Sequence, residues 1–140
     1  MDRVSPEARS RIMSRIRSKD TKAEIIMRKA LRDIGLRGYR IHYNIVGKPD
    51  IVFTSVKLAI FIDGDFWHGY LWKKCGNVPE KPYWKEKIAG NMDRDKQVNR
   101  ELKKIGWKVI RIWEHDAMKK SQVAAFKIQK AYMCLVQQKT

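Results

Sequence analysis

Residues 48–63 read KPDIVFTSVKLAIFID, and this stretch decides the fold. It contains two β-rich apolar runs, residues 50–53 and 57–62, with two short polar residues between them. We interpret the two runs as a β-hairpin. In an antiparallel pair, the start of one strand lies beside the end of the next. Asp50 and Asp63 are therefore expected at the same end of the sheet.

Helical patterns flank this hairpin on both sides. A helix is expected over residues 20–34, where Thr21 and Glu24 form a capping box and Gly35 ends the apolar spacing. Further helices are expected from about residue 84 to residue 105 and over residues 117–138.

Two more segments have strand character, residues 39–43 and 107–113, whereas residues 63–82 look irregular. The chain has no repeats and no convincing linker. The sequence therefore predicts one α/β domain over residues 1–140, with a mixed central sheet of about four strands flanked by helices.

The net charge indicates the kind of partner. The chain has 31 Lys and Arg against 15 Asp and Glu, a formal net charge of +16. A domain this basic attracts polyanions, and the release of counterions from phosphates makes nucleic acid the default partner. A merely basic or ribosomal-type protein is the alternative. Residues 1–20 are rich in arginine and are expected to include a short basic helix, with too thin an apolar strip to be a core helix.

Several protein classes are excluded at this level. No apolar stretch approaches the ~18 residues of a membrane span, and the polar amino terminus does not resemble a signal peptide. Cys75 and Cys134 lie far apart and form neither a disulfide framework nor a CxxC metal knuckle. We therefore expect a cytoplasmic protein that is not attached to a membrane.

Carboxylates gather where the predicted strands end. Like charges such as those of Asp50 and Asp63 repel each other unless a cation or a proton joins them, and oxygen ligands suit Mg²⁺. The competing interpretation is that both residues cap loops at the sheet edge and face water. The strand pattern alone leaves both interpretations open.

Two further residues favour chemistry at this place. His68 follows closely after Asp63 and could take a proton from an attacking water, although a lone histidine is more often structural. Asp95 lies on the same helical face as Ile88 and Leu102, which should face the sheet, and a buried carboxylate needs a partner. That partner could be His68, or an Arg or Lys from a nearby helix. Glu24 completes the capping box and could face the same site.

The segment from Ile60 to His68 resembles the Vsr family, in which an apolar strand precedes a Gly-x-Phe-Trp-His signature. Pro49 and Asp50 similarly resemble the PD-(D/E)xK nucleases. The resemblance continues through residues 10–21, 84–88, 91–95 and 106–109 and ends near residue 114, so it covers about residues 5–115. It implies a restriction-endonuclease-like fold and a Mg²⁺-dependent nick in one DNA strand beside a T:G mismatch.

The resemblance also implies a role for each candidate residue. Asp50 would be a metal ligand, and the backbone carbonyl of Ile62 would bind the same Mg²⁺. Asp63 would contact the metal or its waters, and Glu24 would hold waters bound to the metal. His68 would be the general base and Asp95 the carboxylate that orients it. Two Mg²⁺ ions are expected, as in other two-metal nucleases.

Aromatic and basic residues gain DNA-binding roles from the same resemblance. Phe66, Trp67 and Trp84 match positions at which family members push side chains into the DNA stack. The alternative for Phe66 and Trp84 is burial in the core. Met13 and Ile16 match the minor-groove arm of the family. Phosphates or the groove would be contacted by Arg11, Arg15 and Arg17, and the aromatic segment is flanked by Lys73 and Lys74.

The chain departs from the family at its structural zinc. Asp65, Tyr70, Trp72 and His115 stand where family members carry Cys or His ligands, and only His115 is a good zinc ligand. Cys75 is near enough to substitute, but the spacing is poor. We expect no zinc, with Tyr70 and Trp72 packed in its place.

Other functions compete with the mismatch nickase. A Vsr-like nuclease of a restriction, homing or defence system would keep the chemistry and cut another DNA target. A non-catalytic DNA-binding protein on a decayed nuclease scaffold, or an RNA-binding ribosomal-type protein, would not need the clustered carboxylates. Because only one strand is cut, we expect a monomer on double-stranded, mismatched DNA in the nucleoid.

Overall fold

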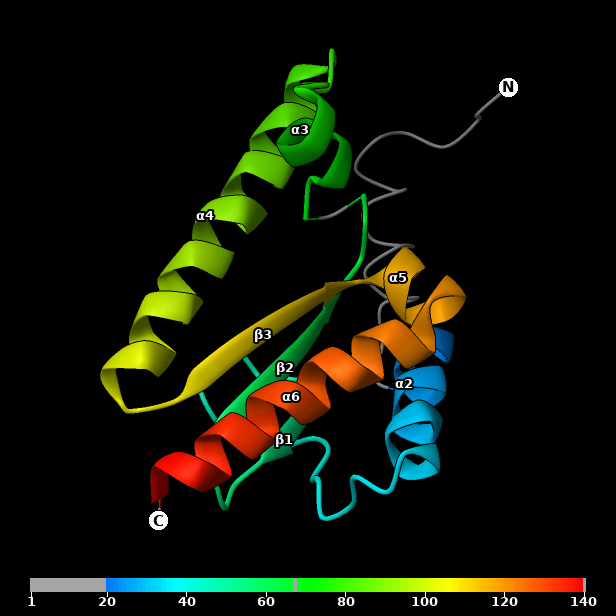
Figure 1. Ribbon diagram of the computed structural model, residues 1–140. Coiled ribbons are helices and arrows are strands. Elements are labelled where there is room, and N and C mark those ends of the chain that lie inside the picture. Colours follow the sequence, from blue (N-terminus) through cyan, green and yellow to red (C-terminus); the bar gives the residue numbers. More distant parts are fainter. Residues whose placement is uncertain (1–19, 67, 140) are drawn as a thin grey trace.

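A computed structural model describes residues 20–66 and 68–139 (Figure 1). The basic helix and DNA-binding arm predicted within residues 1–20 lie outside the described residues, apart from Asp20. No helix in the described part of the chain is long and apolar enough to cross a membrane.

A three-stranded mixed sheet forms the centre of the molecule. It consists of β1 (Ile51–Phe53), β2 (Leu58–Asp63) and β3 (Lys108–Trp113), in the order β1-β2-β3. β1 pairs antiparallel with β2, which confirms the predicted hairpin, and Ile51 lies opposite Ile60. β2 and β3 run parallel, so the carboxyl ends of these two strands meet at one edge of the sheet.

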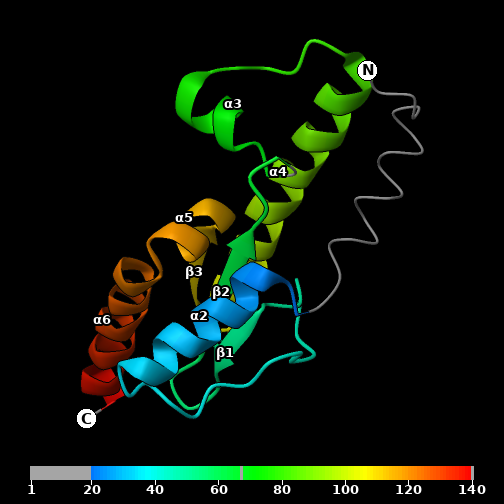
Figure 2. The same ribbon diagram turned by 90° about the vertical axis from the view of Figure 1, so that its right-hand side faces the viewer.

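Helices cover both faces of this sheet, which gives three layers (Figure 2). α2 (Lys22–Asp33), α5 (Glu114–Lys119) and α6 (Ser121–Lys139) lie on one face, and α4 (Pro82–Lys104) lies on the other. All residues of β1, and most of those of β2, are buried. Burial on both faces explains why these strands are continuous apolar runs rather than alternating ones.

Each face has its own apolar cluster. Met27, Leu31 and Ile128 from the helices pack against Ile60 on the first face. Leu102 of α4 and the half-buried Val98 pack with Ala59 and Phe61 on the other. These two clusters hold the strands rigidly, and the side chains at their ends are therefore well positioned.

The prediction of about four strands was wrong by one. Residues 39–43 form no strand, and a single bridge joins Arg40 to Val52. His42 adopts a positive φ of 55°, which interrupts an extended backbone. The alternating side chains of this segment therefore follow a bent connection along the sheet edge.

One additional helix and one helix boundary also differ from the prediction. Residues 63–82 were expected to be irregular, but they include the short helix α3 (Tyr70–Cys75). The helix expected from about residue 84 begins at Pro82, because proline suits the first turn of a helix.

The helix expected over residues 117–138 is divided into α5 and α6 at Lys120, whose φ of −130° and ψ of 46° are not helical. No proline or glycine marks this break. Ser121, a residue type that often begins a helix, is a local signal at the break that the predicted continuous helix did not use.

α3 and the first turns of α4 extend beyond the carboxyl ends of β2 and β3 (Figures 1 and 2). The first residues of α2 reach the same end of the sheet. The polar and charged candidate side chains gather at this end of the sheet.

Candidate active site

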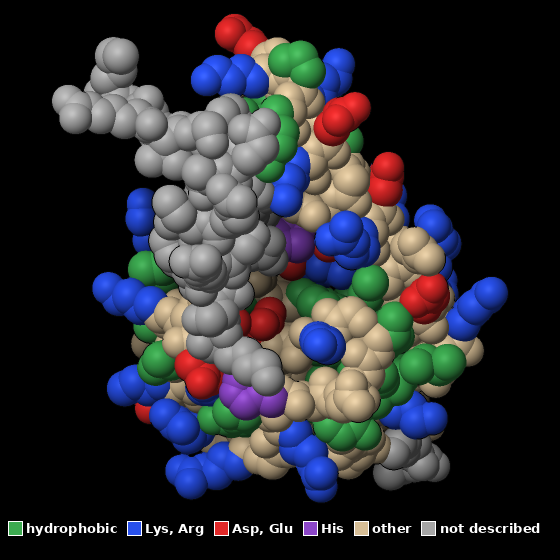
Figure 3. Space-filling view, turned by 180° about the vertical axis from the view of Figure 1, so that it is seen from behind, with side chains coloured by type: hydrophobic (Ala, Val, Ile, Leu, Met, Phe, Trp, Pro, Cys, Tyr) green, Lys and Arg blue, Asp and Glu red, His purple; other side chains and the backbone are tan. Residues whose placement is uncertain are grey.

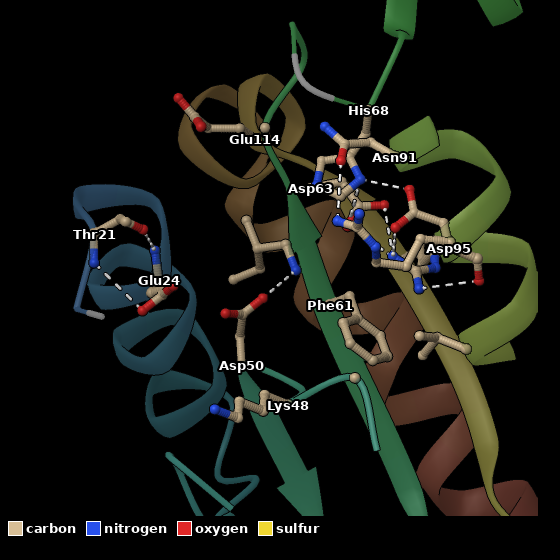
Figure 4. A pocket seen from close by; sticks show the side chains of 16 residues that line it. Thr21, Glu24, Lys48, Asp50, Phe61, Asp63, His68, Asn91, Asp95 and Glu114 are labelled. Atoms are coloured by element: carbon tan, nitrogen blue, oxygen red, sulfur yellow. Dashed lines mark hydrogen bonds and ion pairs between the residues drawn. The ribbon is translucent and has the colours of Figure 1, made fainter. Parts of the chain in front are cut away.

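A pocket lies where β2 ends, between the start of α2 and the middle of α4 (Figure 4). Its volume of about 260 Å³ has room for several waters or a phosphate group, since one water occupies ~30 Å³. Figure 3 shows acidic and histidine side chains in a hollow of one face, with lysines and arginines around it. The residues that line the pocket include Glu24, Lys48, Asp50, Ile62, Asp63, His68, Asn91, Arg94, Asp95 and Arg111.

Asp50 lies directly before β1 and is fixed by the neighbouring strand. Its Oδ2 accepts a hydrogen bond of 2.6 Å from the backbone amide of Ile62. Burial, together with the nearby Glu24 and Asp63 carboxylates, raises the pKa of Asp50 to about 7, although the hydrogen bond from Ile62 acts to lower it. A carboxylate in such surroundings is stabilised in its charged form by a cation.

Glu24 approaches Asp50 from the first turn of α2. The capping box is present: the hydroxyl of Thr21 accepts a hydrogen bond from the backbone amide of Glu24. In return, Oε2 of Glu24 accepts from the backbone amides of Thr21 at 3.3 Å and Asp20 at 2.8 Å. Arg28 also pairs with Glu24 at 3.3 Å. For Glu24, the role of helix cap and the place in the pocket are thus compatible.

His68 and Asp95 form a buried pair on the other side of the pocket. Nδ1 of His68 lies 2.5 Å from Oδ2 of Asp95, which α4 carries into the pocket. Burial of Asp95 opposes its charge, but the hydrogen bond to His68 and the nearby Arg111 leave its pKa below the usual value. Asp95 therefore remains charged and holds the imidazole in one orientation.

Asp63 ends β2, and its side chain is only 5% exposed. It does not point at Asp50: Figure 4 shows it beside His68 and Asp95, whereas Asp50 lies near Glu24. Nη1 of Arg111 donates to both carboxylate oxygens of Asp63, at 2.9 and 3.2 Å. The two carboxylates predicted to converge thus line one pocket, but they have different partners.

A divalent cation fits the Asp50 side of this pocket better than the other side. Asp63, His68 and Asp95 offer ligand atoms within 4.8 Å of one another. That group already pairs with Arg111 and within itself, and a metal there would meet the positive guanidinium. Among the described residues no Lys or Arg forms an ion pair with Asp50. Its half-buried carboxylate is therefore the donor best suited to a hard cation.

The aromatic residues Phe66 and Trp84 lie outside the core, and Phe66 lines the apolar pocket beside α3. Phe66 is 46% exposed, and its ring meets that of the half-buried Trp84 edge to face at 5.3 Å. Neither residue belongs to the two apolar clusters. Lys74 is exposed, and Lys73 lies over the Trp113 ring at 5.3 Å. Trp67, Met13, Ile16, Arg11, Arg15 and Arg17 lie outside the described residues.

Direct contacts join several of the positions that match the family's zinc ligands. Nδ1 of His115 lies 3.0 Å from Asp65. Tyr70 packs edge to face against His115 and against Trp113, at 4.5 and 5.0 Å. Trp72 is half-buried and lines a neighbouring apolar pocket. These contacts connect the Gly64–Phe66 turn to α5.

Sequence reasoning missed Arg111, which contacts both acidic partners of His68. The strand pattern held a signal. Ile110 and Ile112 are buried on one face of β3, so Arg111 must point to the opposite face, toward α4. A charged residue at an inward position of a covered sheet requires a buried partner.

Comparison with known proteins gives a consistent result. A family model described as DNA mismatch endonuclease Vsr matches residues 1–74. The chain is 40% identical over 133 residues to the type II nicking enzyme V.NmeDIP of Neisseria meningitidis serogroup C, covering 94% of this chain and 90% of that one. It is 41% identical to the type II nicking enzyme V.HpaIIP of Haemophilus parainfluenzae, over 94% and 95% of the two chains. It is 34% identical to the DNA mismatch endonuclease Vsr of Escherichia coli K12, over 76% and 69%.

Proposed function

The chain belongs to the Vsr family of DNA endonucleases, and from this premise we propose that it nicks one strand of duplex DNA beside a T:G mismatch, with Mg²⁺ as cofactor. The observation that supports the proposal most is the arrangement of one pocket: a half-buried Asp50 on one side and a hydrogen-bonded His68–Asp95 pair on the other. A carboxylate that can bind a cation, Asp50, and an imidazole that can accept a proton, His68, thus face the same pocket.

Asp50 and the backbone carbonyl of Ile62 are the proposed metal ligands. Asp63 and Glu24 stand on either side and would accept hydrogen bonds from surrounding water. Mg²⁺ bound there would stabilise negative charge on the phosphate and on the leaving oxygen, and a second ion is expected to share this work. The proposed site needs no movement of β1 or β2, because the Ile62 amide already fixes Asp50.

His68 is the proposed general base. A neutral imidazole that donates its Nδ1 proton to Asp95 carries its lone pair on Nε2, from where it can accept a proton from the attacking water. Asp95 fixes this tautomer and stabilises the imidazolium once the proton has moved. The product would be a nick with a 5′-phosphate.

Exposed aromatic residues and basic side chains form the proposed DNA contact. Phe66 with Trp84, and the adjacent Trp67, would enter the base stack, where unstacking costs least at a mispair. Lys73 and Lys74 would contact phosphates next to them. The arm containing Met13, Ile16, Arg11, Arg15 and Arg17 would bind along the groove.

A second candidate keeps this chemistry and changes the DNA target. The relatives from Neisseria and Haemophilus are named type II nicking enzymes, which specifies a one-strand cut but no mismatch. Such a protein would nick a fixed sequence or another structure irrespective of a T:G pair.

One assay separates the candidates. End-labelled duplexes that differ only in T:G or T:A at one position are incubated with the protein in Mg²⁺ or in EDTA, and Asp50→Ala is the matched inactive control. We expect one labelled strand of the T:G duplex to be cut in Mg²⁺ alone, and only by the unsubstituted protein. Equal cutting of both duplexes would favour the second candidate, and binding without any cutting would contradict both.

A further inference from the structure

Arg111 is placed between the two acidic partners of His68. β3 lies parallel to β2 with Arg111 opposite Phe61, and its guanidinium stacks over the Phe61 ring at 4.2 Å. The side chain then reaches past Phe61 to Asp63, two residues further along β2. We propose that Arg111 is a positioning residue of the nicking reaction, which holds Asp63 and Asp95 in the arrangement that His68 requires. This inference rests on the proposed function of the site.

The hydrogen bonds of the guanidinium use its shape. Nε donates to Oδ1 of Asn99 at 2.8 Å, and Nη1 donates to Asp63. Nη2 donates to the backbone carbonyl of Asp95 at 3.4 Å. A planar fork can serve three directions at once, whereas a lysine ammonium is a single point of charge on a flexible stem.

These contacts connect β2 to α4 at the catalytic pair. Asp63 belongs to the strand, whereas Asn99 and Asp95 belong to the helix. Oδ1 of Asp95 lies 3.5 Å from Nη1 of Arg111 while its Oδ2 faces His68. Arg111 therefore fixes the position of the helix carboxylate relative to the strand, and with it the orientation of the imidazole.

The charge of Arg111 is also required. Oδ1 of Asp63 lies 3.9 Å from Nδ1 of His68, so Asp63 and Asp95 both approach the same ring nitrogen. Two buried carboxylates so close together repel each other unless a cation lies between them. With the guanidinium paired to Asp63, Asp95 remains the hydrogen-bond partner of His68.

The test compares Arg111→Lys, which keeps the charge but not the fork, with Arg111→Met, which keeps much of the apolar stem alone. Arg32→Lys is the matched control, because Arg32 is exposed near the end of α2 and contacts only Tyr39 among the partners described. Single-turnover nicking and DNA affinity in Ca²⁺ are measured for each protein. The tautomer of His68 is measured by ¹⁵N NMR of histidine-labelled protein without DNA.

We expect Arg111→Lys to lower the nicking rate by about 10–100-fold with unchanged DNA affinity, because a displacement of ~1 Å is enough for such a loss. We also expect the Nδ1-protonated tautomer of His68 to give way to a mixture, more completely in Arg111→Met. A rate and tautomer equal to those of the unsubstituted protein would overturn the proposal. If the unsubstituted protein nicks no duplex but the tautomer depends on Arg111, the positioning role stands and the proposed function fails.

Discussion

At the scale of a single residue, the surroundings of Asp50 make the stability of the folded protein depend on pH. Burial, with Glu24 and Asp63 nearby, raises its pKa from 3.8 to about 7. The pKa of Asp50 is higher in the folded than in the unfolded chain. Its contribution to the free energy of unfolding is therefore fully present below the unfolded pKa and is lost as the pH rises through the folded pKa of about 7. We expect the protein in EDTA to be less stable at about pH 8.5 than at about pH 5.5, by on the order of 2 kcal/mol, in urea unfolding.

Asp50→Asn is the control for this prediction. The amide oxygen of asparagine can still accept from the Ile62 amide, but the side chain does not ionise. The substituted protein should therefore lose most of the difference between the two pH values, while its nicking activity disappears. An identical pH dependence in both proteins would show that another group is responsible.

Asp95 allows a test of chemistry that leaves the pocket filled. In Asp95→Asn the side chain keeps its size, but its amide can donate to Nδ1 of His68 and so favour the opposite tautomer. By analogy with other oriented histidine bases, we expect the single-turnover nicking rate to fall by ~10²–10⁴-fold with little change in DNA affinity. A loss of less than about threefold would mean that Asp95 does not orient the base.

At the scale of elements, Gly69 connects His68, the proposed general base, to α3. It has a φ of +71°, and a Cβ at this position would lie 2.7 Å from the Met92 sulfur and 3.1 Å from Ile88. We expect Gly69→Ala to lower stability by about 1–3 kcal/mol and to lower activity as well, because His68 moves with the start of α3.

Gly90, inside α4, is the matched control. A Cβ there meets nothing within 4 Å and the backbone is helical. Gly90→Ala should therefore stabilise the protein by roughly 0.5–1 kcal/mol in the same thermal unfolding experiment. Equal effects of the two substitutions would contradict the close packing of α3 against α4.

The elements differ in how well their sequences predict them. β1 and β2 were predictable because both faces are covered, which leaves an uninterrupted apolar run, and α2 because its capping box is local. Residues 39–43 were misassigned because a positive φ at His42, set by the surrounding chain, outweighed local alternation.

The candidate site residues likewise divide into those that local sequence predicts and those that depend on the fold. The contact between His68 and Asp95 could be predicted because a helical stripe brings Asp95 toward the sheet. The separation of Asp63 from Asp50 could not, since it depends on Arg111, and Arg111 reaches the site only through the parallel pairing of β3 with β2. Strand order and direction, rather than local pattern, were the missing information.

At the scale of the whole molecule, the excess of positive charge should dominate the approach to DNA. A formal net charge of +16 means that binding releases many counterions from the phosphates. We expect a plot of log Kd against log salt concentration, from fluorescence anisotropy in Ca²⁺, to have a slope of about 4 or more. A slope near zero would exclude an electrostatic origin for the affinity.

Lys73→Gln with Lys74→Gln should reduce that slope by about 1–2, since each lost phosphate contact removes about one unit. The same change should weaken binding to matched and mismatched duplexes alike. A selective loss for one duplex would instead assign these lysines to the choice of target.

The parallel pairing of β2 with β3 has a consequence for the order in which the protein folds. The hairpin of β1 and β2 joins neighbouring segments and should form early, whereas Leu58 must wait for Lys108, with α3 and α4 between them. Closing so long a loop is slow, and contacts between distant segments form late. The ion pair of Asp63 with Arg111, 48 residues apart, is completed only at that step. A partly synthesised or partly folded chain therefore lacks this contact, and we expect the proposed active site to be assembled, and DNA to be cut, only once the whole chain has folded.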